Sequence, residues 1–323
     1  MDTLLSVIIP THRRLNLLRQ AVDSVLRQTV RPDEIIIVED DKVIDYSNLK
    51  HESWSGQVEL LSLPGLGSGA ARNFGAGHAG GRYLAFLDDD DLWKPEKLEI
   101  QLSVFEKYPH VDLVFCDGFI FSEPGRFVGR FQDNKGVVRR APWFKTRDGV
   151  NLVNSGLGIN EIFCGIAITS SIMVRRSLFE KIGGFDGSLG AADDVDLVYR
   201  ANSAGFVAYV DSPLFEYRLT SSSLSRNLEK SFLDTLNLLR KWTNPDISRD
   251  KLKFIKCERR KSLSSIAYLL FSQDRLDEAR HWYEKSLRER PRLIDMVYFF
   301  GTYFGRHNVS KLRALKHFIA KRV

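Results

Sequence analysis

The chain has 323 residues, of which 43% are hydrophobic and 27% are charged, and its formal net charge at pH 7 is +6. This length suits one large domain or two smaller ones, and the ordinary composition excludes a disordered or fibrous protein. Residues 291–323 hold seven Lys and Arg against one Asp, so the remainder is charge-balanced, which argues against nucleic-acid binding.

Residues 1–90 alternate between short apolar runs and helical patterns, as βαβ units do. The apolar runs predict strands at 5–10, 34–38, 58–63 and 83–87, and apolar residues at helical spacing predict helices at 16–28 and 70–79. Polar clusters follow three of these strands: Thr11-His12, Glu39-Asp40-Asp41 and Asp88–Asp91. Because ligands of open α/β sheets bind beyond the carboxyl ends of the strands, we expect the three clusters to form one site.

The pattern changes in the second half of the chain. Strands are predicted at 112–121 and 165–174, helices at 176–182 and 193–204, and a loop at 123–160. From about residue 229 the pattern is helical, which places the domain boundary between Ser221 and Lys230. Within this region, residues 262–291 match one tetratricopeptide-like helix pair. Since a lone repeat cannot bury its own apolar face, it must pack on the rest of the chain or on a partner.

Four consecutive aspartates, Asp88–Asp91, are the strongest sign of chemistry. Adjacent carboxylates repel one another, so a divalent cation such as Mn²⁺ or Mg²⁺, shared with phosphate oxygens, is expected to offset their charge. The alternative is a solvated acidic turn that caps the next helix. A second acidic cluster, Asp193-Asp194 with Asp196, opens the predicted helix 193–204 and holds either a base or a plain acidic helix cap.

The glycine-rich turn at 65–70 allows another interpretation. It fits GxGxxA, follows a strand, opens a helix and precedes Asp88 by about 20 residues, which is the dinucleotide-binding fingerprint. However, the turn follows a complete βαβ unit, whereas the fingerprint usually occupies the first one. Four aspartates would also repel a pyrophosphate. An NAD-dependent oxidoreductase is therefore the less favoured hypothesis.

Taken together, these segments resemble glycosyltransferase family 2, whose members are inverting enzymes with a GT-A fold. The resemblance spans about residues 4–225. It is carried by SVIIPTHRR, EIIIVEDD, GSGAARNFG and GGRYLAFLDDDDLWKPEKLEIQ, then by SSIMVRRSLFEKIGGFDGSL, ADDVDLVYRANSAGF and YRLTSSSLS. It implies an α/β fold with a mostly parallel, Rossmann-like sheet and helices on both faces, followed by an α-helical C-terminal extension.

The same resemblance implies a domain organisation and a role for each matching residue. Residues 1–110 would bind the nucleotide sugar, residues 111–225 the acceptor, and residues 226–323 would form the helical region with a basic tail at 292–323. Pro10 and Thr11 would line the nucleotide pocket, Glu39 and Asp40 would contact the base, and Arg72 would face the nucleobase or phosphate. Asp88 and Asp90 would form the DxD motif, with Asp90 as the direct metal ligand and Asp89 in the donor site. Asp194 would be the catalytic base, with Asp193 beside it.

Two positions depart from the family pattern. Asp193-Asp194 replaces the usual Glu-Asp, which shortens one side chain and preserves the charge. Thr220 stands where a histidine often contacts the metal or the diphosphate, so metal affinity is expected to be weaker, or the loop 123–160 to close as a lid in a different way.

The implied reaction is a metal-dependent transfer, with inversion, of a sugar from a nucleotide-sugar donor to an acceptor hydroxyl. UDP is the expected nucleotide, and the acceptor would be a glycan or a lipid-linked sugar in cell-surface polysaccharide synthesis. The alternative from another class is a non-catalytic scaffold that acts through its helical C-terminus.

Sequence also bears on location. Three dispersed cysteines indicate a reducing cytoplasm, and no apolar stretch reaches the ~18 residues of a membrane span. The aromatic segment 296–304 and the basic tail after it predict peripheral contact with the inner face of a membrane. Packing of Tyr298–Phe304 against the preceding helices is the alternative.

Overall fold

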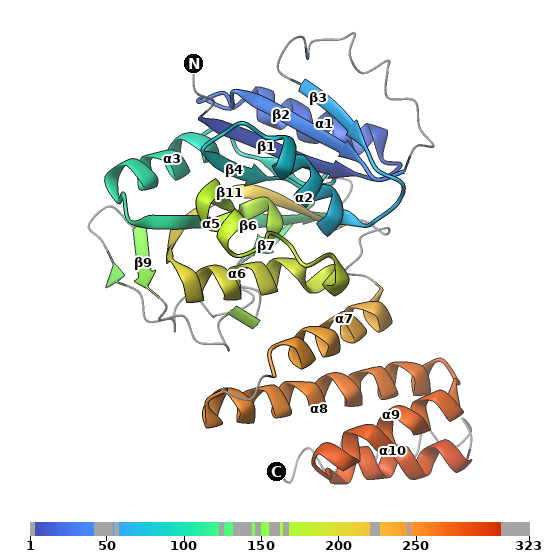
Figure 1. Ribbon diagram of the computed structural model, residues 1–323. Coiled ribbons are helices and arrows are strands. Elements are labelled where there is room, and N and C mark those ends of the chain that lie inside the picture. Colours follow the sequence, from blue (N-terminus) through green and yellow to red (C-terminus); the bar gives the residue numbers. More distant parts are fainter. Residues whose placement is uncertain are drawn as a thin grey trace. The chain divides into compact units, whose positions relative to one another are not determined.

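The computed structural model describes residues 4–41, 54, 58–122, 126–131, 144–145, 150–154, 162–163, 168–219, 227–243 and 247–304. The chain divides into two compact units, Met1–Ser223 and Leu224–Val323. The first unit is α/β and the second is helical (Figure 1). The sequence predicts a boundary between Ser221 and Lys230.

The α/β unit is built on one mixed sheet. Among the described residues its main path contains nine strands, in the order β3 (Val58–Ser62), β2 (Glu34–Glu39), β1 (Leu5–Thr11), β4 (Tyr83–Phe86), β10 (Met173–Arg175), β6 (Val111–Ser122), β11 (Phe206–Leu219), β9 (Val150–Asn154) and β8 (Phe144–Lys145). Two more strands join its sides: β5 (Leu92–Trp93) pairs with β11, and β7 (Arg126–Arg130) pairs with β6. The expected parallel arrangement holds for β3, β2, β1 and β4, whereas β10 runs antiparallel to both β4 and β6.

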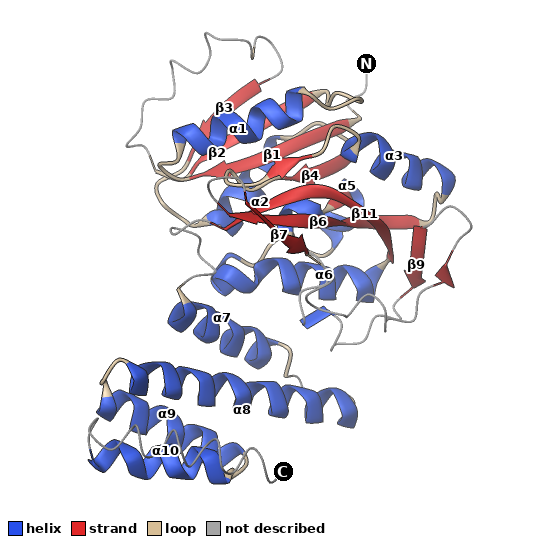
Figure 2. Cartoon of the chain, turned by 180° about the vertical axis from the view of Figure 1, so that it is seen from behind, coloured by secondary structure: helices blue, strands red, loops and turns tan. Residues whose placement is uncertain are grey.

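Helices cover both faces of this sheet (Figures 1 and 2). On one face lie α1 (Leu15–Leu26) and α3 (Lys97–Lys107), and on the other lie α2 (Ser68–His78), α5 (Arg176–Lys181) and α6 (Asp193–Ala204). Strand β1 is buried throughout because its alternate residues face the two helical layers. Val7 and Ile9 share a core cluster with Leu18 of α1, and Ile8 lies against Gly75 of α2. The predicted α/β fold with helices on both faces is confirmed.

The helical unit contains α7 (Leu228–Lys241), α8 (Arg249–Ser272), α9 (Leu276–Glu289) and α10 (Leu293–Phe304). All the helix positions that match the tetratricopeptide pattern are buried: Leu263, Ile266, Ala267, Leu270, Ala279, Tyr283 and Ser286. Likeness to that repeat nevertheless stays a prediction. Of the helices that the structure describes, none combines the length and the apolar character needed to cross a membrane.

Two sequence expectations are wrong in detail. In the segment 165–174, Thr169–Ser171 form a 3₁₀ turn and only Met173–Val174 belong to a strand, β10; residues 165–167 lie outside the described part. The turn forms because its hydroxyls bond locally, as when Ser171 Oγ donates to the carbonyl of Ile168 at 2.7 Å. The expected loop at 123–160 contains short strands, β7, β8 and β9, within its described residues.

Lys97, in the first turn of α3, is a fully buried lysine that helps to hold this 3₁₀ turn. Its Nζ donates to Oε1 of Gln101 at 2.7 Å and lies 4.0 Å from the centre of the Trp93 ring. Gln101 and Trp93 in turn donate to the carbonyls of Ser171 and Ser170, each at 2.8 Å. Burial disfavours the charged ammonium and lowers the pKa of Lys97 to about 8.

This burial predicts a pH-dependent stability. An unfolded lysine has a pKa near 10.5, so between pH 8 and pH 10.5 the folded chain binds fewer protons and its free energy of unfolding rises with pH. Between pH 7 and pH 9.5 the wild type should gain about 2 kcal/mol more unfolding free energy than Lys97→Met, measured by urea unfolding. Lys107→Met, at an exposed lysine of the same helix, is the control. An equal gain in unfolding free energy for Lys97→Met and Lys107→Met would contradict the prediction.

Candidate functional site

The polar ends of β1, β2 and β4 meet at one edge of the sheet. Thr11 pairs in register with Glu39, and the backbone N–H of Asp40 donates to the Thr11 carbonyl at 2.9 Å. From the neighbouring strand end, Asp89 Oδ2 accepts a hydrogen bond from Thr11 Oγ1 at 2.7 Å. The structure therefore brings these predicted site residues together. Pro10 and Glu39 are themselves buried at the ends of their strands.

Arg72 of α2 connects this edge to the start of α6. Its two terminal nitrogens donate to different carboxylates, Nη2 to Asp88 Oδ1 at 2.7 Å and Nη1 to Asp193 Oδ2 at 2.8 Å. The side chain is buried and lies over the ring of Phe185 at 5.1 Å. Burial works against the charge, but the two carboxylates raise the pKa of Arg72 above its ordinary value. Arg72 is therefore a permanent cation between two acids that are distant in sequence.

Gly69 and Asn73 of α2 allow this helix to lie close to the start of α6. A Cβ atom on Gly69 would lie 2.8 Å from Asp193 Oδ2 and 3.0 Å from the Cα of Gly187, so no side chain fits there. One turn later, Asn73 donates to the carbonyl of Phe185 and accepts from its N–H, at 2.7 and 2.8 Å. The segment that leads into α6 is therefore fixed directly against α2.

Asp193 and Asp194 differ in their surroundings although they are adjacent. Asp193 is 4% exposed and bound to Arg72, and burial raises its pKa against the opposing charge of Arg72. Asp194 is partly exposed, and its Oδ1 accepts from the N–H of Val195 at 2.7 Å. Asp196, one residue further, is fully buried and paired with Arg200. Of these three carboxylates, Asp194 is the one that a ligand can reach.

Arg14 is a site residue that the sequence interpretation missed. It follows β1 by three positions, and its Nη1 donates to Asp89 at 3.2 Å and to Asp90 at 2.8 Å. Burial raises the pKa of Asp89 to about 6, and it also raises the pKa of Asp90, while Arg14 opposes both rises. The sequence signal for Arg14 was the Arg13-Arg14 pair directly after the polar end of the first strand. Two arginines at that point are suited to pair with the acids that follow the neighbouring strands.

Asp91 has a structural environment that separates it from its neighbours. It is 1% exposed, accepts from Ser170 Oγ at 2.6 Å and accepts from the backbone N–H of Arg218 at 3.0 Å. Burial raises its pKa well above the ordinary value. The Arg218 side chain also donates to the Asp90 carbonyl at 2.8 Å. Ser170, in the 3₁₀ turn before β10, and Arg218, in β11, thus position the aspartate run, a role that the sequence did not reveal.

Asp40 occupies the glycine-rich turn that resembles a dinucleotide fingerprint. Its two carboxylate oxygens accept from the backbone N–H groups of Leu66 and Gly67, at 2.7 and 2.6 Å. Gly67 has a φ of 92° and stands at the N-cap of α2, where the fingerprint would offer its N–H groups to a pyrophosphate. Because a carboxylate already holds these donors, the geometry argues against the oxidoreductase hypothesis.

The residues that the resemblance assigns to a metal have suitable chemistry but do not form a complete cage. In the described part of the chain, no three His, Cys, Asp or Glu side chains are grouped to hold a cation alone. Asp88 and Asp90 are more exposed than Asp89 and Asp91, and they interact electrostatically. Two carboxylates plus phosphate oxygens are a common Mg²⁺ arrangement, so the donor set fits a cation that arrives with a diphosphate. Thr220 lies outside the described residues.

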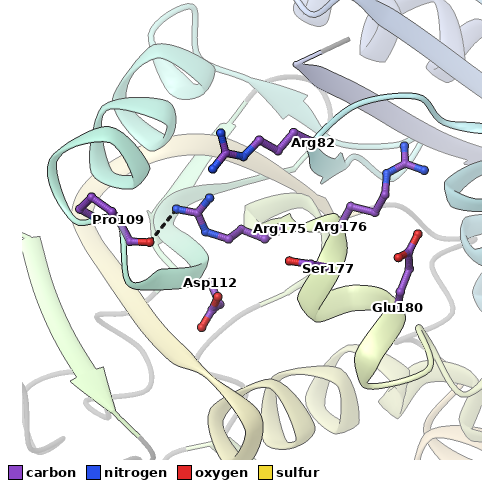
Figure 3. Close-up of a pocket in the computed structure, with 7 residues that line it drawn as sticks. All are labelled: Arg82, Pro109, Asp112, Arg175, Arg176, Ser177 and Glu180. Atoms are coloured by element: carbon purple, nitrogen blue, oxygen red, sulfur yellow. Dashed lines mark hydrogen bonds between the residues drawn. The ribbon is translucent and has the colours of Figure 1, made fainter. Parts of the chain in front are cut away.

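A hollow of about 500 Å³ lies elsewhere, at the opposite edge of the sheet (Figure 3). Its lining is Arg82, Pro109, Asp112, Arg175, Arg176, Ser177 and Glu180. Arg175 donates to the carbonyls of Val111 and Pro109, and Arg176 donates to those of Gly81 and Ala79. Two of its three arginines thus hold the backbone together, so the hollow is not the candidate site.

The chain is similar to known proteins in sequence and in fold. The family model described as "Glycosyl transferase family 2" matches residues 6–183. A Rickettsia felis protein named "Uncharacterized glycosyltransferase" is 25% identical over 228 residues, 70% of this chain and 36% of that protein. This chain thus spans about a third of that relative's length.

Two further matches carry more specific names. The E. coli "UDP-Glc:alpha-D-GlcNAc-diphosphoundecaprenol beta-1,3-glucosyltransferase WfgD" is 27% identical over 234 residues, 70% of this chain and 81% of that protein. The crystal structure of S. aureus TarS 1-349 in complex with UDP-GlcNAc matches with a TM-score of 0.56 at 16% identity, covering 93% of this chain and 79% of that one. The match to TarS is a likeness of fold.

The double ion pair of Arg72 predicts a large structural effect of its removal. Arg72→Met leaves Asp88 and Asp193 without a counter-charge, and we expect the free energy of unfolding to fall by about 3 kcal/mol. Urea unfolding measures this, with Arg82→Met, at an exposed arginine, as control. Adding Asp193→Asn should restore part of the loss because it removes the more deeply buried unpaired charge. If Arg72→Met lowered the free energy of unfolding by less than about 1 kcal/mol, the double ion pair would be contradicted.

Proposed function

Because the chain belongs to glycosyl transferase family 2, we propose that it transfers a sugar from a UDP-sugar to an acceptor hydroxyl, with inversion at the anomeric carbon. The observation that carries this proposal is the Asp88–Arg72–Asp193 bridge. It ties the strand end where a nucleotide sugar would bind to the helix that presents Asp194. UDP is supported by the UDP-GlcNAc in the TarS complex and the UDP-Glc in the WfgD name.

Asp194 is the proposed base. Its carboxylate takes the proton of the acceptor hydroxyl as that oxygen attacks the anomeric carbon, while the bond from that carbon to the diphosphate breaks on the opposite face. A base must lie within hydrogen-bond reach of the proton it takes, and Asp194 is the accessible acid at this end of the site. Asp193 and Arg72 position it, because their ion pair fixes the first turn of α6.

Asp88 and Asp90 are proposed to hold Mn²⁺ or Mg²⁺ together with the donor. A divalent cation there would neutralise charge on the departing diphosphate. Arg14 holds the Asp90 carboxylate in place at 2.8 Å, and Thr11 orients Asp89 beside it. Asp91 keeps the run attached to the 3₁₀ turn before β10 through Ser170, and to β11 through Arg218. These residues set the direction in which Asp88 and Asp90 face.

For the acceptor, we propose a lipid-linked sugar used in cell-surface glycan synthesis at the cytoplasmic face of a membrane. The support is the diphosphoundecaprenol-linked acceptor in the name of WfgD, which shares 27% identity with 70% of this chain. The same name describes transfer to GlcNAc, so the acceptor hydroxyl would belong to the first sugar on the lipid.

Asp194→Asn tests the base. The amide keeps the shape of the side chain and removes the proton acceptor, so hydrolysis of UDP-Glc or UDP-GlcNAc, in which water takes the place of the acceptor hydroxyl and UDP is released, should fall at least ~10²-fold. UDP affinity, measured by calorimetry, should stay unchanged. Glu180→Gln, at an exposed acid of α5, is the matched control. Near-wild-type turnover in Asp194→Asn would move the role to Asp193 or Asp196, and no turnover in the wild type with any UDP-sugar would favour the scaffold alternative.

Asp90→Asn tests the metal. Without a cation the diphosphate faces the remaining carboxylates, so UDP affinity in Mn²⁺ should fall at least tenfold to the level seen in EDTA. Glu180→Gln, at an exposed acid of α5 outside the site, again serves as the control. Calorimetric UDP binding that is indifferent to both EDTA and Asp90→Asn would reject the metal site.

A further inference from the structure

The outward face of α10 is apolar along its whole length. Its exposed side chains are Leu293, Met296, Phe300 and Tyr303, with exposed fractions of 61%, 37%, 59% and 58%. Their spacing of three, four and three residues places them in one row on the helix. They are four of the nine large apolar side chains that are exposed among the described residues, so the row is a concentration and not a scatter. We call these four residues the α10 stripe.

The opposite face of α10 attaches the helix to its own unit. Tyr298 is 3% exposed, stacks on Tyr283 at 6.0 Å and meets Phe271 edge to face at 5.3 Å. Asp295, the only charged residue of the helix, is buried and accepts from Ser264 and Ser286 at 2.6 and 3.1 Å. The helix is therefore held without the α10 stripe. From the sequence, this segment either contacts a membrane or packs on the preceding helices. Packing is found for Tyr298 and not for Phe300 or Tyr303.

One cation contacts the stripe in the structure, and further Lys and Arg lie on both sides of it in the sequence. Arg290 and Arg292 directly precede α10, are exposed, and form no ion pair with any carboxylate that the structure describes. The Arg280 guanidinium lies 4.0 Å from the centre of the Tyr303 ring. After the helix, residues 305–323 contain six Lys and Arg and no Asp or Glu.

We propose that the α10 stripe docks on an anionic lipid surface, with α10 lying in the plane of the membrane. Apolar and aromatic side chains on one face, with Lys and Arg beside them, are the combination that interfacial helices use. Each cation near an anionic leaflet adds attraction that salt screens. A helix of 12 residues is only about 18 Å long, so it lies on the bilayer and does not cross it. A second copy of the chain is the weaker candidate, because it would bring two strongly basic segments together.

Co-sedimentation of the full chain with vesicles tests this without any sugar donor, so the result does not depend on the proposed transfer. We expect binding to phosphatidylcholine vesicles with 30% phosphatidylglycerol at low salt, and at least tenfold weaker binding to pure phosphatidylcholine. Phe300→Ser/Tyr303→Ser should weaken binding to the anionic vesicles at least tenfold. Phe127→Ser/Val128→Ser, at side chains of 60% and 51% exposure on β7, should leave it unchanged. Lys311→Gln/Lys316→Gln should weaken it severalfold.

Three outcomes would overturn the proposal. One is anionic-vesicle binding by Phe300→Ser/Tyr303→Ser that equals the wild type. Another is a wild-type dimer in sedimentation velocity that the same variant abolishes, with no vesicle binding, which would make the stripe a contact between copies. The last is a lowered unfolding temperature of that variant when the wild type does not bind vesicles, which would mean that residues 305–323 cover the stripe.

Discussion

The guanidinium of Arg72 lies between two carboxylates from distant parts of the chain, and both sides of the site depend on it. Asp88 follows β4 in the strand order of the first half, while Asp193, 121 positions after Arg72, begins α6. A buried charge requires paired partners, and here Asp88 comes from the same half of the chain as Arg72 while Asp193 comes from the second half. The Nε atom of Arg72 has no hydrogen-bond partner, so the two ion pairs and the Phe185 ring compensate for the burial of its charge. The position of α6 at the sheet edge follows from this arrangement.

Burial gives chemically identical carboxylates different tasks. Asp91 and Asp193 are enclosed and have fixed partners, so they maintain geometry. Asp88, Asp90 and Asp194 have the same functional group but more contact with solvent, so they remain available to a ligand. Arg14 and Arg72 reduce the repulsion among these carboxylates. From the sequence alone, a bound cation is expected to offset it. Part of the acidic run is therefore compensated by the protein itself, and any cation has only the remainder to offset.

Sequence patterns predicted β1, β2 and β4 well because each is an apolar run with a polar end. They also placed Asp88, Asp193 and Asp194 at the ends of elements, since acidic clusters there are visible locally. Arg14 and Arg218 were missed because their partners lie far away in the sequence: Arg14 binds Asp90, 76 positions away, and Arg218 donates to a carbonyl 128 positions away. The strand expected at 165–174 failed for a similar reason, as the hydroxyls of Ser170 and Ser171 make contacts that no periodicity encodes. Long-range polar pairing is the part that periodicity and composition omit.

Strand β10 has a consequence for the order in which the chain folds. It lies between β4 and β6, yet it is synthesised after both, so the two parts of the sheet cannot join until Met173–Arg175 has left the ribosome. Until then β4 is an open edge with unpaired backbone groups and an apolar sequence, the kind of edge that recruits other strands. A fragment that ends near residue 110 would contain β4 without β10, so it would expose that edge permanently.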